Sequence, residues 1–433
     1  MRLKILLLIV IVSVCGISSH AQISRRRLES DFVLKAEKTK YLHSLEERIL
    51  NTFGGKPPVI REKKWDKLFY ELSVDLYRSP HVKKALKIVL NKIDDVSENL
   101  SVRAILTARA LYPHELENEV YSLFERTERL NAAVYAFHYL YLNNRKKYRP
   151  YLRNISRRFG NDSLLVRLTY DYVNESEIFY DDDALREIFS PDFLKGELVI
   201  LTVLRSVRKI PGLTLIRKPD GAFLFEGDSL WAISQLGYSV TDFPYYLLDG
   251  NTPQGLYLFD GFYQSKKKSI GPTPVPIIRL PFEVSPKKFL RKNGEEKWNK
   301  ELYADILPKA LGKFNSTFEA YYAGKLGRKL LVMHGSTDNP ALYKNEKYFP
   351  LTPSTGCLTS YEKWDEKTGK LLESDQLKLV NAILKLKKKR GYLFVFELND
   401  KNEKLTKAEI MNLISRLQKI GTTEKQAINS KKF

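Results

Sequence analysis

One cysteine and one histidine, each beside a glycine, are the residues of this sequence best suited to covalent chemistry. The stretch MHG places His334 before Gly335, and the stretch STGC places Cys357 after Gly356. A thiol reacts as its thiolate, so a nucleophilic cysteine needs a base or a cation nearby, and His334 can be that base. Gly356 lets the backbone approach a substrate closely and direct amide N–H groups at a developing oxyanion. The alternative is a buried, inert cysteine, because thiols pack as small hydrophobic groups.

Residues 1–21 have the pattern of a secretory signal peptide. Two basic residues precede an apolar run over residues 5–14, and Ala21 ends a small-x-small cleavage site. The apolar run is too short to span a bilayer comfortably. Lipidation at Cys15 is the less favoured alternative, because the preceding valine fits a lipobox poorly. The sequence therefore predicts export to the periplasm or the cell envelope.

If the protein is exported, its cysteine count and its net charge indicate a candidate reactive thiol and an anionic partner. The chain has two cysteines, and cleavage would leave Cys357 alone, without an internal disulfide. A single thiol outside the cytosol is a candidate reactive group. The formal net charge would fall from +21 to +19 with the loss of Arg2 and Lys4. Such a charge suits an anionic setting such as cell-wall polymer or a membrane surface, and export disfavours nucleic acid as the partner.

Two kinds of hydrophobic pattern divide the rest of the chain into two regions. Residues 24–195 carry successive amphipathic patterns, such as SPHVKKALKIVLNKI, which predict an all-α bundle or a short helical-repeat domain. Residues 196–400 carry short apolar runs between Gly, Pro and Asp, such as GLYLFDGFY and YLFVFEL, which predict a mainly β domain. A helical insertion is expected at 285–328, and a last helix with a tail at 401–433. The predicted fold class is α+β multidomain.

Two motifs of the β region resemble those of the L,D-transpeptidases, which have a YkuD-type catalytic domain. A strand ending in MHG, then a loop, then STGCL matches the active-site motif of that family. Upstream, NTPQGLY matches the family's Thr-Pro-x-Gly turn, and the motifs follow in the family's order. The resemblance covers roughly residues 200–400. It implies that residues 196–400 form an L,D-transpeptidase-like catalytic domain.

The resemblance also implies a cysteine acyl-enzyme that acts on peptidoglycan stem peptides. Cys357 would be the nucleophile and His334 its general base, with the imidazole oriented by a backbone carbonyl near Gly335 and Ser336. The amides of Gly356 and Cys357 would stabilise the oxyanion. Cys357 would attack the carbonyl of a diamino acid followed by D-Ala. An amine of a neighbouring stem peptide, or water, would then take the acyl group.

The sequence departs from the family pattern on both sides of the cysteine. Family members usually carry His before the Gly-Cys pair and Arg two residues after the cysteine, where this chain has Thr355 and Thr359. Arg279 or a nearby lysine would then replace the missing arginine. The loop between His and Cys is long and carries aromatic residues. The residues expected to contact substrate are Ser336, Ser354, Thr355, Thr359, Tyr348 and Arg279.

Three functions fit these patterns. The favoured one is an exported peptidoglycan L,D-transpeptidase in cell-wall cross-linking or remodelling. The second is an L,D-carboxypeptidase or endopeptidase that passes the same thioester to water. The third is a non-catalytic cell-wall binding or scaffold protein with a degenerate site. In each, the helical domain would bind a cell-envelope protein partner or support the second domain.

No cofactor or metal is expected. No cluster has metal-ligand spacing, and no phosphate-binding Gly-rich loop precedes a helix. The remaining histidines of the helical region are interpreted as structural or surface residues; they are His43, His81, His114 and His138.

Overall fold

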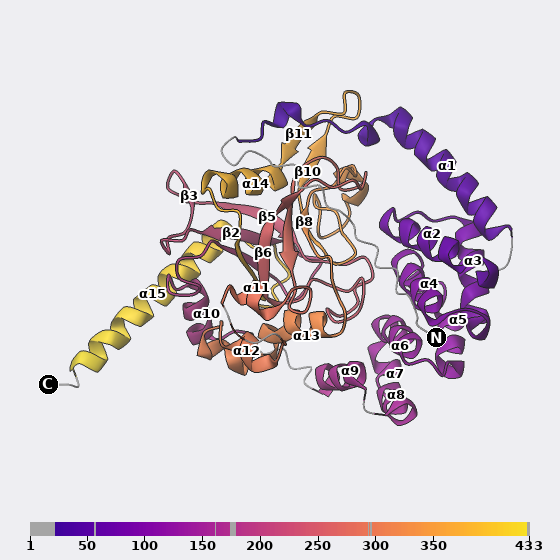
Figure 1. Ribbon diagram of the computed structural model, residues 1–433, viewed down its shortest axis with the longest axis horizontal. Helices are drawn as coiled ribbons and strands as arrows, with labels where there is room; N and C mark the ends of the chain where they lie inside the picture. Colours follow the sequence, from indigo (N-terminus) through magenta and orange to yellow (C-terminus); the bar gives the residue numbers. More distant parts are fainter. Residues whose placement is uncertain are drawn as a thin grey trace.

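The protein has a helical array followed by a mainly β part (Figure 1). This computed structural model describes residues 22–55, 58–160, 162–173, 179–292, 294 and 297–430. The signal peptide expected at 1–21 lies outside these residues. The α+β organisation in two parts agrees with the sequence-based prediction. Among the described helices, none combines the length and apolar content that a bilayer crossing requires.

The helical array packs around α4 and α6. Every residue from Ala132 to Tyr141 of α6 is buried. The sequence provides caps: the Ser79 and Ser97 hydroxyls accept the Val82 and Leu100 amides at the starts of α3 and α4. The helices are α1 (Lys35–Phe53), α2 (Glu62–Val74), α3 (Pro80–Asn91), α4 (Glu98–Leu111), α5 (Glu117–Arg126), α6 (Leu130–Asn143), α7 (Arg145–Tyr148), α8 (Tyr151–Phe159), α9 (Ser163–Val173) and α10 (Asp182–Phe189).

An eight-stranded sheet with the order β7-β6-β12-β1-β2-β5-β9-β8 forms the centre of the β part. It is nearly closed, because Ile277 of β7 forms an antiparallel bridge with Val332, the residue before β8. The strands are β1 (Val199–Leu204), β2 (Gly212–Arg217), β5 (Ala232–Leu236), β6 (Gly255–Tyr263), β7 (Val275–Arg279), β8 (Met333–His334), β9 (Leu358–Ser360) and β12 (Gly391–Glu397). Two small pairs lie outside it, β3 (Phe225–Glu226) with β4 (Ser229–Leu230) and β10 (Glu362–Trp364) with β11 (Leu371–Ser374).

Both faces of the central strands are covered. All six residues of β1 are buried, as expected for a strand between two packed layers. Ile200 and Ile216 belong to a core that continues into the helical array, whereas Val199 and Leu201 belong to a second core with α10 and the C-terminal helix. The remaining helices are α11 (Pro286–Leu290), α12 (Lys300–Ala304), α13 (Glu319–Lys325), α14 (Asp375–Lys385) and α15 (Lys407–Ser430). The first three occupy the predicted insertion, and α15 projects from the body (Figure 1).

The N-terminal segment 22–34 packs on the β part, although the sequence assigned it to the helical domain from residue 24. The Ile23 amide donates to Asn381 Oδ1 at 2.9 Å, and Asn381 Nδ2 donates to the Ile23 carbonyl at 3.0 Å. Leu28 and Val33 share a small core with Trp364. From there α1 crosses to the array (Figure 1). The array is therefore anchored to the β part at both ends.

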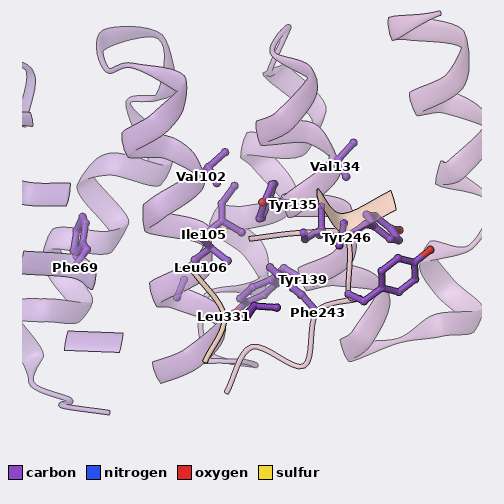
Figure 2. Packing of buried hydrophobic residues seen from close by; sticks show 14 of the residues in the cluster. Phe69, Val102, Ile105, Leu106, Val134, Tyr135, Tyr139, Phe243, Tyr246 and Leu331 are labelled. Carbon is purple, nitrogen blue, oxygen red and sulfur yellow. The ribbon is translucent and has the colours of Figure 1, made fainter. Parts of the chain in front are cut away.

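A segment of the β part, residues 237–254, inserts against the helical array. Phe243 and Tyr246 lie among side chains of α4 and α6, together with Leu331 from the segment that leads to β8 (Figure 2). The Leu248 amide donates to the Tyr135 hydroxyl at 2.7 Å. Arg103 of α4 forms an ion pair with Asp249 at 2.8 Å. The 237–254 segment is thus fixed by helices on one side, and on its other side it contacts the cysteine loop.

Candidate active site

The strand register joins the segment that ends in His334 to the cysteine loop. Strands β8 and β9 run parallel, with Met333 opposite Leu358 and His334 opposite Thr359. Cys357 is the residue before β9 and packs at the edge of the core that contains Met333 and Leu358. The parallel pair therefore brings into one region of the sheet the two segments that the sequence singled out.

Two motifs that are far apart in the sequence meet beneath Cys357. The Thr252 hydroxyl, from the NTPQGLY turn, donates to the Gly356 carbonyl at 3.0 Å. The Ser354 hydroxyl accepts the Gly356 amide at 3.0 Å and donates to the Cys357 carbonyl at 2.8 Å. These bonds hold the cysteine loop as a tight turn on the 237–254 segment.

Gly356 is required by its conformation and by a close neighbour. Its φ is +108°, and a Cβ built there would lie 2.1 Å from Arg328 Nη2 and 2.3 Å from the Gly250 carbonyl oxygen. The buried Arg328 donates to the carbonyls of Tyr245, Gly250 and Asn251, the last two at 2.5 Å. Sequence reasoning missed this arginine, because no local pattern marks it.

His334 is held as a neutral imidazole with a defined tautomer. Its Nδ1 lies 2.6 Å from the Gly335 carbonyl oxygen. A carbonyl can only accept, so Nδ1 carries the proton and Nε2 keeps its lone pair. Burial lowers the pKa of His334 to about 4, with a smaller contribution from the positive charge of Lys267, while the bond to Gly335 opposes the shift. The carbonyl contact matches the one that the resemblance implied.

Cys357 is partly exposed and is a thiol at rest. Burial raises its pKa, while a backbone hydrogen bond from Val332 and the positive charges of Lys267 and Arg328 act in the opposite direction. At neutral pH the site therefore holds a neutral thiol and a neutral imidazole. A neutral imidazole with a free Nε2 is the form of histidine that can accept a proton from a thiol.

The helical array reaches the edge of this site. Lys267 Nζ donates to the hydroxyl of Tyr70, on α2, at 2.8 Å. The guanidinium carbon of Arg103 lies 5.0 Å from the centre of the Tyr70 ring. An element outside the β part thus holds a cation whose charge acts on both Cys357 and His334.

A buried carboxyl group lies behind His334 and was also missed. Glu362 Oε1 accepts hydrogen bonds from Thr273 and Ser374, each at 2.7 Å, and its Oε2 is buried without a partner among the described residues. A Cβ at Gly335 would lie 2.1 Å from that Oε2. Burial raises the pKa of Glu362 to about 8, so the group is protonated at neutral pH. The contact explains why the residue after His334 is glycine.

Some residues expected to contact substrate have other roles. Thr359 is buried, and its hydroxyl donates to the Thr352 carbonyl at 2.5 Å. Tyr348 is buried and stacks on Tyr238 with 5.6 Å between ring centres. The Gly356 amide already donates to Ser354, which leaves the Cys357 amide as the oxyanion donor of the expected pair. These three groups stabilise the loop.

The other expected contacts differ in exposure. Thr355 is partly exposed, and Ser336 is buried with its hydroxyl accepting the Asp338 amide at 3.0 Å. Arg279 forms an ion pair with Glu283 at 3.6 Å. Its charge also acts on Tyr263, whose pKa responds to Cys357 as well. Arg279 and Cys357 thus both lie near Tyr263.

Comparisons with known proteins give no independent assignment of this site. Neither the family models nor the curated proteins nor the solved structures that were compared match this chain. Within the described ranges, no group of three or more His, Cys, Asp or Glu side chains is arranged to hold a metal ion.

Proposed function

We propose that the protein is an exported, cysteine-dependent peptidoglycan L,D-transpeptidase that acts through an acyl-enzyme on Cys357. The observation that carries the proposal is the hydrogen bond between Thr252 of the NTPQGLY turn and Gly356 of the cysteine loop, which leads into the strand paired with the one that ends in His334. The proposal implies an L,D-transpeptidase-like fold for residues 196–400, peptidoglycan stem peptides as substrates and a location in the periplasm or cell envelope. None of these requires a cofactor.

In the proposed reaction, the Cys357 sulfur attacks a stem-peptide carbonyl while its proton passes to His334 Nε2. The oxyanion of the tetrahedral intermediate accepts the Cys357 amide. Collapse breaks the peptide bond, and the leaving amine takes the proton from Nε2, which leaves a thioester. An amine of a second stem peptide then attacks the thioester, gives its proton to Nε2 and restores the thiol. The neutral imidazole at rest suits this role, because it can accept a proton at neutral pH.

A second candidate is a non-catalytic cell-wall binding protein with a degenerate site. Burial raises the pKa of Cys357, and the Gly356 amide is engaged by Ser354. Both features are also typical of a thiol that serves only in packing. The two candidates differ in one property that can be measured, the rate at which Cys357 is acylated in the folded protein.

Acylation by a carbapenem, followed by intact mass, tests the proposal. By the resemblance, family members are acylated by such β-lactams at the active cysteine. The mature protein should gain one adduct, which should be absent from Cys357→Ala and from His334→Ala. His43→Gln, on the exposed side of α1, is the matched control and should react like the wild type.

A wild-type protein that gains no adduct, and whose Cys357 also reacts slowly with iodoacetamide while folded, would contradict the proposal. That result would favour the binding protein. If the adduct forms, incubation with defined stem peptides would separate transfer to an amine from transfer to water.

A further inference from the structure

A cavity of about 830 Å³ lies between the helical array and the β part, away from Cys357. Helices α6 and α9 line one side, and the 237–254 segment, α13 and the end of β12 line the other. Neither Cys357 nor His334 lines it. A cavity of this size accommodates a ligand larger than a single amino acid. Sequence patterns do not reveal this cavity, because its walls come from distant parts of the chain.

The floor of the cavity carries more acidic than basic groups. Arg208 is paired with Glu397 at 2.5 Å, and Arg167 with Asp171. The third carboxyl group, of Glu319, accepts the Gln254 amide at 2.8 Å and its side-chain Nε2 at 3.1 Å. Among the described floor residues, three carboxyl groups thus face two guanidinium groups. Burial and the nearby Glu397 raise the pKa of Glu319 to about 8, so this carboxyl group is protonated at neutral pH. An ammonium group bound beside Glu319 would favour its ionised form, so the floor can accept one more positive charge with release of one proton.

The same floor has a buried donor without an acceptor. The Arg167 side chain is only 8% exposed, and its Nε has no hydrogen-bond partner within the described part of the chain. The guanidinium lies over the ring of Tyr170, which also lines the cavity, at 4.4 Å from the ring centre. An unpaired buried donor costs about 1–3 kcal/mol, so a ligand oxygen at this position would be favoured.

The rim carries cations at the surface. Arg145 is exposed and Lys209 is half-buried, and neither has an ion pair among the described residues. Arg145 lies over the Tyr141 ring at 5.9 Å and Lys209 over the Tyr238 ring at 5.4 Å. Asp242 and Asp400 also lie along the cavity. The rim thus offers Arg145 and Lys209 to acidic groups of a ligand whose other end reaches the floor.

We infer that this cavity binds a short acidic peptide that ends in a free amino-acid head group. The ammonium of the head group would lie among Asp171, Glu319 and Glu397, and its carboxylate would accept from Arg167. Further carboxylates would point toward Arg145 and Lys209. This site is separate from Cys357, and the inference does not depend on acyl transfer.

Calorimetric titration of the full mature protein, as Cys357→Ala, tests the inference with three tetrapeptides. The first contains diaminopimelate, whose side chain ends in an ammonium and a carboxylate on one carbon. The second is acetylated on that amine, and the third has lysine in place of the diamino acid. We expect the first peptide to bind at least tenfold more tightly than the second, which lacks the charge, and than the third, which lacks the carboxylate.

Two variants locate the binding. Glu319→Gln should remove the preference for the free amine over the acetylated peptide. Arg145→Ala, an exposed change that leaves the core intact, should weaken binding several-fold while keeping that preference. Thermal unfolding checks that both variants are folded.

The inference is overturned by any of three results: no binding of the first peptide, equal binding of the free and acetylated peptides, or an unchanged preference in folded Glu319→Gln. Because the readout is binding to a protein without the thiol, failure here is distinguishable from failure of the acyl-transfer proposal.

Discussion

Each of the two parts of the molecule contains a buried histidine, and their surroundings differ in one respect. His138, in the helical array, lies 3.1 Å from the Tyr172 hydroxyl through Nδ1 and 3.1 Å from the Tyr246 hydroxyl through Nε2. His334, in the β part, uses Nδ1 for the Gly335 carbonyl, and no hydrogen bond to its Nε2 occurs among the described residues. Burial lowers the pKa of both, to about 3 and about 4.

The comparison shows that a depressed pKa does not by itself mark a functional histidine. Both imidazoles are neutral at pH 7 for the same reason, desolvation. Only the one with an uncommitted nitrogen can accept a proton from a substrate or a thiol. The sequence-based interpretation of His138 as structural agrees with its position between two tyrosines of different segments.

The largest expected difference is in acylation. His334→Gln should slow carbapenem acylation of Cys357 by about 10²–10⁴-fold, the usual contribution of a general base. His138→Gln should leave the acylation rate per folded molecule unchanged. It should lower stability by about 1–3 kcal/mol, because the hydroxyls of Tyr172 and Tyr246 lose their hydrogen-bond partner. Stopped-time mass spectrometry and urea unfolding measure the two effects. If His138→Gln also abolished acylation, the division between the two histidines would be wrong.

The next effect concerns the glycine of the cysteine loop. Gly356→Ala places a Cβ 2.1 Å from Arg328 Nη2 at a φ of +108°, so it should cost about 3 kcal/mol or more and reduce acylation. Gly312→Ala is the control, because its Cβ would meet nothing within 4 Å. Chemical denaturation of both variants gives the comparison. Equal stabilities would mean that the turn around Cys357 is not as tightly packed as described.

The histidines also predict a pH dependence of stability. In the unfolded chain a histidine gains its proton as the pH falls through about 6.5, but folded His138 does not until about pH 3. Unfolding therefore binds protons, and stability is lost as the pH falls below 6.5. Between pH 7 and pH 5 one such histidine lowers the free energy of unfolding by about 2 kcal/mol.

The difference in free energy of unfolding between the wild type and His138→Gln should accordingly be about 2 kcal/mol smaller at pH 5 than at pH 7. Chemical denaturation at both pH values measures it. Exposed His43→Gln is the control for the loss of an imidazole at the surface. If the stability difference between the wild type and His138→Gln instead increased at pH 5, His138 would not be a neutral buried imidazole.

The smallest effect concerns the cation held by the array. Lys267→Met should raise the pKa of Cys357 further and slow its reaction with iodoacetamide by about two- to threefold, because the exposed ammonium is screened by solvent. Tyr70→Phe should have a smaller effect in the same direction. Lys266→Met, at the neighbouring exposed lysine, is the control. An unchanged rate in Lys267→Met would show that the array does not influence the thiol.

Local patterns predicted most of the elements, and long-range contacts explain what was missed. The runs GLYLFDGFY and YLFVFEL form β6 and β12 with little change in their bounds. This is because a short apolar run that begins at a glycine indicates a buried strand. His334 and Cys357 could be named because each lies beside a glycine. Arg328 and Glu362 could not, since each acts on residues far away in the sequence and no short motif marks it. The same holds for Tyr70, which approaches the site only because the helices pack there.

The bond between Ile23 and Asn381 joins positions 358 residues apart and bears on the order of folding. A chain made from its N-terminus exposes Leu28 and Val33 long before their partner helix α14 exists. The array can form early from local contacts, but its first anchor stays undocked until the last quarter of the chain arrives. Incomplete chains thus leave the side chains of Leu28 and Val33 exposed, and complete folded chains bury them. Burial of these two side chains therefore distinguishes a fully folded molecule from an incomplete one.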